Sequence, residues 1–210
     1  MNLQREHAKN AILDQLSCGK SYGEISPELT ALELSATITE KLLDAFPGYY
    51  GRLISLNWAR FLNEPLITEE QQSAYQEILL FLDNVPSMNF PESLQVYLED
   101  ATQNLSTLDI KKLNEKTKES IEDPDTFLSE NKEFLESYLA YIQSEEYKNS
   151  PMAQMKALLN EFNKTSGYYD ILIPAMKRLS PAYAKYCEQS EIANEKIYAI
   201  YPDAKKLDMR

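Results

Sequence analysis

Glycine is scarce in this sequence, and its few copies stand apart from one another. Only five glycines occur in 210 residues, at positions 19, 23, 48, 51 and 167. β-Branched residues are also scarce, whereas Leu, Glu, Lys, Ala and Gln are plentiful. Long unbranched side chains lose little rotamer freedom in a helix, so this composition favours helix over sheet. We predict an all-α fold, a multi-helix bundle of about nine helices.

Positive charge is outnumbered and is not clustered. The chain has 21 Lys and Arg against 33 Asp and Glu, which gives a formal net charge of −12. Phosphate backbones and anionic membrane surfaces both bind clustered cations, so we expect this chain to bind neither nucleic acid nor a membrane by itself. Two interpretations of the acidity stay open. One is a solvated surface, and the other is a surface that attracts cationic ligands.

Cysteines and long apolar runs are also in short supply. Cys18 and Cys187 are far apart and match no metal or redox spacing. The sequence has no signal-peptide pattern and no apolar run near 18 residues, the length of a membrane span. We therefore expect a cytoplasmic protein with both thiols reduced.

Histidine, the usual acid–base group near neutral pH, occurs once, at His7 in the first expected helix. The Glu-x-x-His pairs of helical di-metal sites are absent, as are a phosphate-binding glycine loop and a nucleophile elbow. We predict that the chain is not an enzyme and has no catalytic residue, no metal ligand and no cofactor. A pair of carboxylates brought together by the fold stays open as a minor alternative.

Proline marks where helices begin. In Ser26-Pro27, Asp123-Pro124, Ser150-Pro151 and Ser180-Pro181, a capping side chain precedes a proline, and proline loses no hydrogen bond in the first helical position. Thr68 and Gln71 form the pattern of a capping box, and Pro91-Glu92 marks a further start. With these marks, the helical periodicity predicts nine segments, residues 2–17, 27–45, 49–63, 69–85, 91–122, 124–146, 151–164, 168–179 and 181–201. We expect a break near residues 106–109, and at Pro174 either a kink or two short turns.

Aromatic side chains are the most informative group, with 14 Tyr, 7 Phe and 1 Trp. One interpretation places them in the core, because aromatic rings bury large areas. The other is a pocket between helices that holds a flat or cationic organic ligand by stacking and cation–π contact. Arg60 is spaced to pair with Glu64, four residues on. The candidate ligand-binding residues are Tyr49, Tyr50, Trp58, Phe61, Tyr168, Tyr169 and Met176.

Several long strings carry a resemblance to a known family. They are FPGYYGR at residues 46–52, RFLNEP at 60–65, FLDN at 81–84, TSGY at 165–168 and IPAMKRLSP at 173–181. Together they resemble the C-terminal region of a group of MerR-family transcriptional regulators, over about residues 3–202.

This resemblance implies a ligand-sensing, effector-binding domain of a bacterial regulator. Residues 1–20 are then the end of a linking helix that forms a homodimer, and residues 21–210 are the helical sensor, which binds a small organic ligand, such as a cation. DNA binding is expected only through a DNA-binding head that is absent from this chain. The alternative is a stand-alone acidic helical module that binds another protein.

Overall fold

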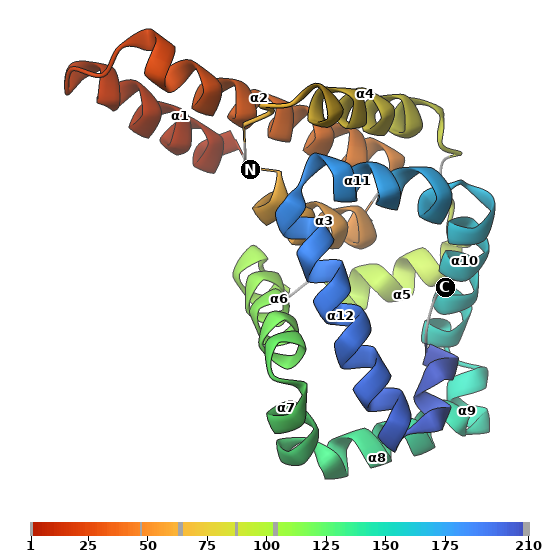
Figure 1. The fold of residues 1–210 in the computed structure, drawn as a ribbon. Coiled ribbons are helices and arrows are strands. Elements are labelled where there is room, and N and C mark those ends of the chain that lie inside the picture. Colours follow the sequence, from red (N-terminus) through yellow and green to blue (C-terminus); the bar gives the residue numbers. More distant parts are fainter. Residues whose placement is uncertain (1, 47, 63–64, 87, 103–104, 208–210) are drawn as a thin grey trace. The chain divides into compact units, whose positions relative to one another are not determined.

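The structure, a computed structural model, describes the backbone of residues 2–46, 48–62, 65–86, 88–102 and 105–207, and the side chains in these ranges except those of residues 2–5, 48–50 and 207. Every regular element in these ranges is a helix, which confirms the all-α class (Figure 1). The expected number of helices was too low, because the described residues form twelve α-helices. The chain divides into two compact units. The first unit is Met1–Ser87 with Ile171–Tyr183, and the second is Met88–Asp170 with Ala184–Arg210.

The first unit is built around one long helix. Helix α2 packs against α1, α3 and α4, and α4 packs against α11. α1 and α2 lie side by side and are joined by a tight turn (Figure 1). Ion pairs join Lys41 to Asp83 and Arg178 to Glu77, so charge as well as apolar packing holds α4 to its neighbours. The elements of this unit are α1 (Asn2–Ser17), α2 (Tyr22–Ala45), α3 (Gly48–Trp58), the 3-10 turn η1 (Ala59–Phe61), α4 (Glu69–Asn84), α11 (Ile173–Leu179) and the first turn of α12 (Pro181–Ile200).

The turn from α1 to α2 corrects one expected helix start. Gly19 has a φ of 94°, a conformation that glycine adopts without strain, and it ends α1. The Ser21 backbone N–H donates to the Glu24 carboxylate at 2.8 Å in a capping box, so α2 begins at Tyr22. The start at Pro27 was therefore wrong, and Pro27 lies inside the helix. Because proline lacks an N–H, the carbonyl of Gly23 loses its helical hydrogen bond. Gly23 is exposed, so water can take the place of the missing donor.

The turn between α2 and α3 requires a glycine. A Cβ atom on Gly51 would lie 1.6 Å from the carbonyl oxygen of Phe46, which is backbone and cannot move aside. The two helices therefore approach more closely than any side chain at residue 51 would permit. This contact gives a physical reason for the last glycine in the FPGYYGR string.

The second unit consists mainly of short helices that pack on their neighbours in sequence. α6 contacts α7, α7 contacts α8, α8 contacts α9 and α9 contacts α10, which also packs on α5. Its elements are α5 (Glu92–Thr102), α6 (Thr107–Glu122), α7 (Pro124–Glu130), α8 (Lys132–Gln143), α9 (Glu145–Lys148), α10 (Pro151–Thr165), the first residues of the π-helical turn η2 (Tyr168–Leu172), the rest of α12, and η3 (Pro202–Leu207).

Capping side chains explain most of the boundaries. Asp123, Ser150 and Ser180 accept from the backbone N–H three residues on, as expected. The expected break near residues 106–109 is present, because Ser106 caps α6. The single helix expected over residues 124–146 is three helices, interrupted at Asn131 and at Ser144. The segment with Pro174 is two short pieces, η2 followed by α11.

Candidate functional site

Three aromatic side chains meet in the core of the first unit, and we call them the aromatic cluster. Trp58 ends α3, Phe61 lies in η1, and Tyr183 lies in the first turn of α12. The Tyr183 ring centroid is 6.0 Å from that of Trp58 and 5.2 Å from that of Phe61, both in edge-to-face geometry. All three side chains are buried. The cluster thus joins two segments that are more than a hundred residues apart in the sequence.

Local structure places Tyr183 in the cluster. Its backbone N–H donates to the Ser180 hydroxyl at 3.2 Å, which fixes the start of α12. The sequence indicated this cap, yet Tyr183 was not among the candidate ligand residues. The spacing of residues in the sequence does not predict that residue 183 packs against residues 58 and 61.

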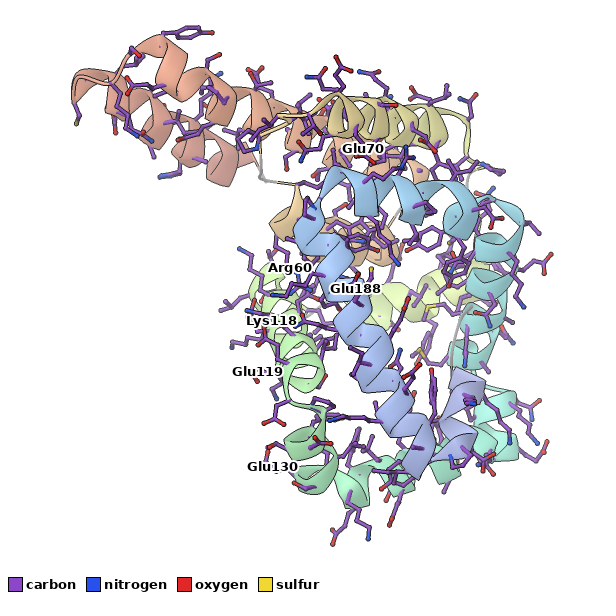
Figure 2. The ribbon with its side chains drawn as sticks, viewed as in Figure 1. Arg60, Glu70, Lys118, Glu119, Glu130 and Glu188 are labelled. Atoms are coloured by element: carbon purple, nitrogen blue, oxygen red, sulfur yellow. The ribbon has the colours of Figure 1, made fainter. Side chains whose placement is uncertain are left out.

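The aromatic cluster has polar groups beside it. Ser55 precedes Trp58 by three residues on α3, is 1% exposed, and its hydroxyl has no hydrogen-bond partner. A buried hydroxyl that lacks a partner in the protein is costly. Arg60, labelled in Figure 2, places its guanidinium 4.6 Å from the centre of the Phe61 ring and donates to the Asn57 side chain at 3.3 Å. Glu64, its expected partner, lies outside the described residues.

A small cavity adjoins Phe61 in the first unit. Its volume is about 10 Å³, which leaves room for about one water molecule. The Tyr75 phenol lies in its wall, and burial raises the pKa of Tyr75, against the opposing effects of the Thr37 hydroxyl and the Lys41 charge. The phenol is therefore protonated near neutral pH. The lining residues are Leu34, Ser35, Ile38, Phe61, Leu62, Leu66, Tyr75 and Leu179.

The candidate ligand residues are divided between the two units. Trp58 and Phe61 belong to the aromatic cluster, and Met176 is fully buried in α11 of the same unit. Tyr168 and Tyr169 belong to the second unit. The side chains of Tyr49 and Tyr50 lie outside the described residues.

Tyr168 and Tyr169 form a pair of their own. Their ring centroids are 5.2 Å apart and the rings are nearly perpendicular. The Tyr169 hydroxyl accepts from the Asn163 side-chain amide at 3.4 Å. Asn163 is 3% exposed, and its amide oxygen has no hydrogen-bond partner. The second unit therefore contains an aromatic pair next to a buried acceptor.

Three carboxylates with a lowered pKa, those of Glu24, Asp109 and Asp123, lie in helix caps. Hydrogen bonds from Ser106 lower the pKa of Asp109, and the backbone N–H of Thr126 lowers the pKa of Asp123. No group of three or more His, Cys, Asp or Glu side chains within the described ranges is placed to hold a metal ion. His7 is exposed on α1.

No protein-family model, no curated protein and no solved structure matches the chain. The resemblance to MerR-type regulators therefore stays a prediction from the sequence strings. Within the part of the chain that the structure describes, no helix combines the length and the apolar character needed to cross a membrane.

Proposed function

We propose that this chain is the ligand-sensing, effector-binding part of a MerR-type bacterial transcriptional regulator that acts in the cytoplasm. The aromatic cluster is the observation that carries the proposal. It combines buried aromatic rings with the buried hydroxyl of Ser55, which lies one helical turn before Trp58 on α3 and has no hydrogen-bond partner among the described residues. Aromatic walls with a few placed polar groups are typical of sites for small organic ligands, including cations. The chain has a sensing role in this proposal, without a cofactor or a catalytic step.

The proposed mechanism is a shift between two packings of the first unit. The cavity beside Phe61 holds about one water, so an organic ligand must separate the aromatic side chains to enter. Such a ligand stabilises an open packing at the expense of the closed one. α3 packs on α2 and α2 packs on α1, so a movement of α3 reaches α1 through two packed helix pairs. A DNA-binding head outside this chain then reads the position of α1.

The proposal includes a homodimer formed through α1. Leu13 and Leu16 are each 38% exposed, and their spacing of three residues places them on one helix face. We expect light scattering to give twice the chain mass for the unmodified protein. Replacing Leu13 and Leu16 together by Lys should give a monomer, whereas Ile67→Lys, at a site 80% exposed outside α1, should leave the dimer intact. A monomeric unmodified chain contradicts this part of the proposal.

Trp58 gives a direct test of ligand binding, because it is the only tryptophan. We expect one or more members of a panel of hydrophobic cations and flat metabolites to change its emission and to raise the melting temperature. Phe61→Leu should weaken that binding, and Tyr22→Leu, at a position 68% exposed on α2, should not. Ligand binding that Phe61→Leu does not weaken would contradict the proposed site. A panel in which no compound binds would contradict the sensor function.

The second candidate function is an acidic helical module that binds another protein. Exposed apolar side chains on several elements favour it, including Ile67, Leu80, Leu108 and Phe134, which are 60–80% exposed. Exposed apolar side chains indicate a binding site for a partner when they form one contiguous patch, whereas single exposed apolar residues are common on any protein surface. Two results together would favour this candidate. A purified protein partner would bind the chain, and no small molecule would change the Trp58 emission or the melting temperature.

A further inference from the structure

A separate group of tyrosines lies on α8 and α9 of the second unit, and we call Tyr138, Tyr141 and Tyr147 the tyrosine group. The ring centroids of Tyr141 and Tyr147 are 5.5 Å apart and the two planes meet at 73°. Tyr138 stacks on Phe134 with 6.1 Å between centroids. Tyr138 is 39% exposed and Tyr141 is 41% exposed. Tyr138 and Tyr141 are therefore partly open to solvent, and the rings of Tyr141 and Tyr147 stand at a large angle to each other.

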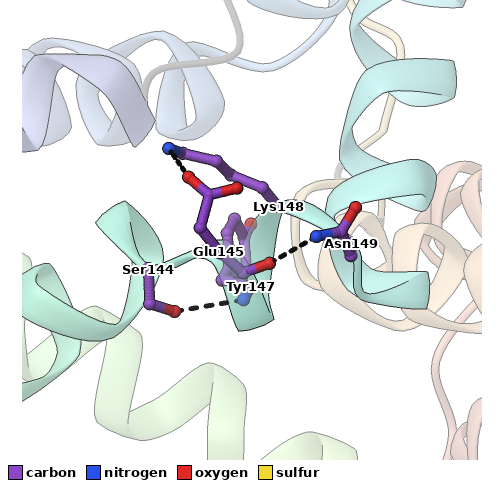
Figure 3. A network of polar contacts seen from close by, with 5 residues as sticks. All are labelled: Ser144, Glu145, Tyr147, Lys148 and Asn149. Carbon is purple, nitrogen blue, oxygen red and sulfur yellow. Dashed lines mark hydrogen bonds and ion pairs between the residues drawn. The ribbon is translucent and has the colours of Figure 1, made fainter.

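The local fold explains this placement. Leu139 is the buried residue of α8, and Tyr138 and Tyr141, three residues apart, share an adjacent face. α8 ends at Gln143, and the Ser144 hydroxyl accepts from the Tyr147 backbone N–H at 3.1 Å to start α9 (Figure 3). This break turns the chain, so that the Tyr147 ring meets Tyr141.

Further contacts hold α9 in its position. The Asn149 side chain donates to the Glu145 carbonyl at 2.8 Å, and Lys148 pairs with the Glu145 carboxylate at 2.6 Å (Figure 3). A four-residue helix has little stability of its own, because helix nucleation is unfavourable. These bonds close α9, the helix that places the Tyr147 ring against Tyr141.

The surroundings of the tyrosine group are negative. Residues 130–148 contain five glutamates and only two lysines, and the lysines lie beside Glu136 and Glu145. Glu130, labelled in Figure 2, is exposed at the end of α7. Burial raises the pKa of Tyr147, and the nearby phenols of Tyr138 and Tyr141 add to the effect, so this phenol is neutral near pH 7. The rings thus offer their electron-rich faces within an anionic field.

We propose that Tyr138, Tyr141 and Tyr147 form an open aromatic cage that binds a quaternary ammonium group. Two rings at a large angle can both present faces to one cation, and the surrounding carboxylates add long-range attraction. A quaternary ammonium group has no N–H that needs a hydrogen-bond acceptor, so aromatic rings alone can surround it. This site goes beyond the proposed sensor function, because it uses other residues in the other unit and does not depend on transcriptional regulation.

Choline and its neutral isostere, in which a tert-butyl group replaces the trimethylammonium group, test the charge requirement. We expect choline to shift the ring NMR signals of Tyr141 and Tyr147, with an affinity on the order of tenfold above that of the isostere. Added salt should weaken choline binding by screening the glutamates. Equal binding of the two compounds would overturn the proposal, because it would show an apolar surface without cation recognition.

Variants of the full chain test the residues. Tyr141→Leu and Tyr147→Leu should each abolish the selectivity for choline, and Tyr147→Phe should retain it, since the ring and not the hydroxyl contacts the cation. Tyr22→Leu, at a position 68% exposed on α2, is the matched control and should bind as the unmodified chain does. If circular dichroism shows that Tyr147→Leu loosens α9, the result for Tyr141→Leu decides whether the cage is present. Choline selectivity that survives Tyr141→Leu would overturn the cage.

Discussion

The two units of this chain are held together in different ways. In the first, α2 is packed by three other helices, and α11 returns from far along the sequence to pack on α4. In the second, most helix contacts are between neighbours in sequence. Of the largest fully buried side chains among the described residues, only Leu94 and Ile110 belong to the second unit. The first unit thus relies on core packing, and the second depends more on its helix caps.

This difference bears on where each proposed site lies. The aromatic cluster is buried among long-range contacts, so a ligand there must compete with core packing. The tyrosine group lies on α8 and on the short capped helix α9, and Tyr138 and Tyr141 are partly exposed, so a cation can reach it without opening the unit.

The largest effect is expected for Gly51→Ala in the first unit. The new Cβ would lie 1.6 Å from the Phe46 carbonyl oxygen, so α3 must move away from α2, at a cost of about 3 kcal/mol or more in the free energy of unfolding. Urea unfolding followed by circular dichroism measures it. Gly23→Ala is the control. It meets no atom within 4 Å and should stabilise α2 slightly by helix propensity. Equal effects of the two changes would show that the close helix contact is absent.

Truncating a core residue in each unit compares the packing directly. Ile78 is 0% exposed on α4, and Ile78→Ala should cost about 2–5 kcal/mol of unfolding free energy. Leu139 is 9% exposed on α8, and Leu139→Ala should lie at the lower end of that range, because its site can collapse more easily. The comparison between the units fails if Leu139→Ala proves the more costly change in urea unfolding.

Removing one helix cap in each unit should have a smaller effect. Thr68→Ala and Ser144→Ala each delete a side-chain acceptor, at a cost of about 1 kcal/mol. Thr68 caps a helix packed on α2 and α11, so its loss should lower global stability. The loss of Ser144 should instead expose the amides of the four-residue α9 to hydrogen exchange. Uniformly faster exchange in both variants would contradict this distinction.

The smallest effect at neutral pH is expected for Asp123→Asn, since asparagine also caps helices well. The Thr126 N–H lowers the pKa of Asp123, so this carboxylate stabilises the fold above its unfolded pKa, near pH 4. That stability is lost as the pH falls through the lower pKa of the folded state. Acid unfolding of α7, followed by amide signals, should therefore be less steep in Asp123→Asn than in the unmodified chain. Parallel acid profiles for the two proteins would rule out this contribution.

For the candidate site, the sequence was partly informative. Trp58 and Phe61 were identified as candidates because they are aromatic, and both lie in the aromatic cluster. Tyr183 was missed because its edge-to-face contacts form only when the start of α12 packs beside Trp58 and Phe61. No local sequence pattern predicts that packing. Tyr168 and Tyr169 were grouped with Trp58 by residue type, but they belong to the other unit.

The sequence by itself determined the helical class, the extent of α1 and most helix starts. These features depend on caps, prolines and side-chain entropy, which act within a few residues. Tertiary structure decided that residues 171–183 join the first unit, that Gly51 faces the Phe46 carbonyl and that Tyr183 meets Trp58. Such contacts form only when distant segments pack, because many alternative pairings share the same local pattern and only the packed core selects among them.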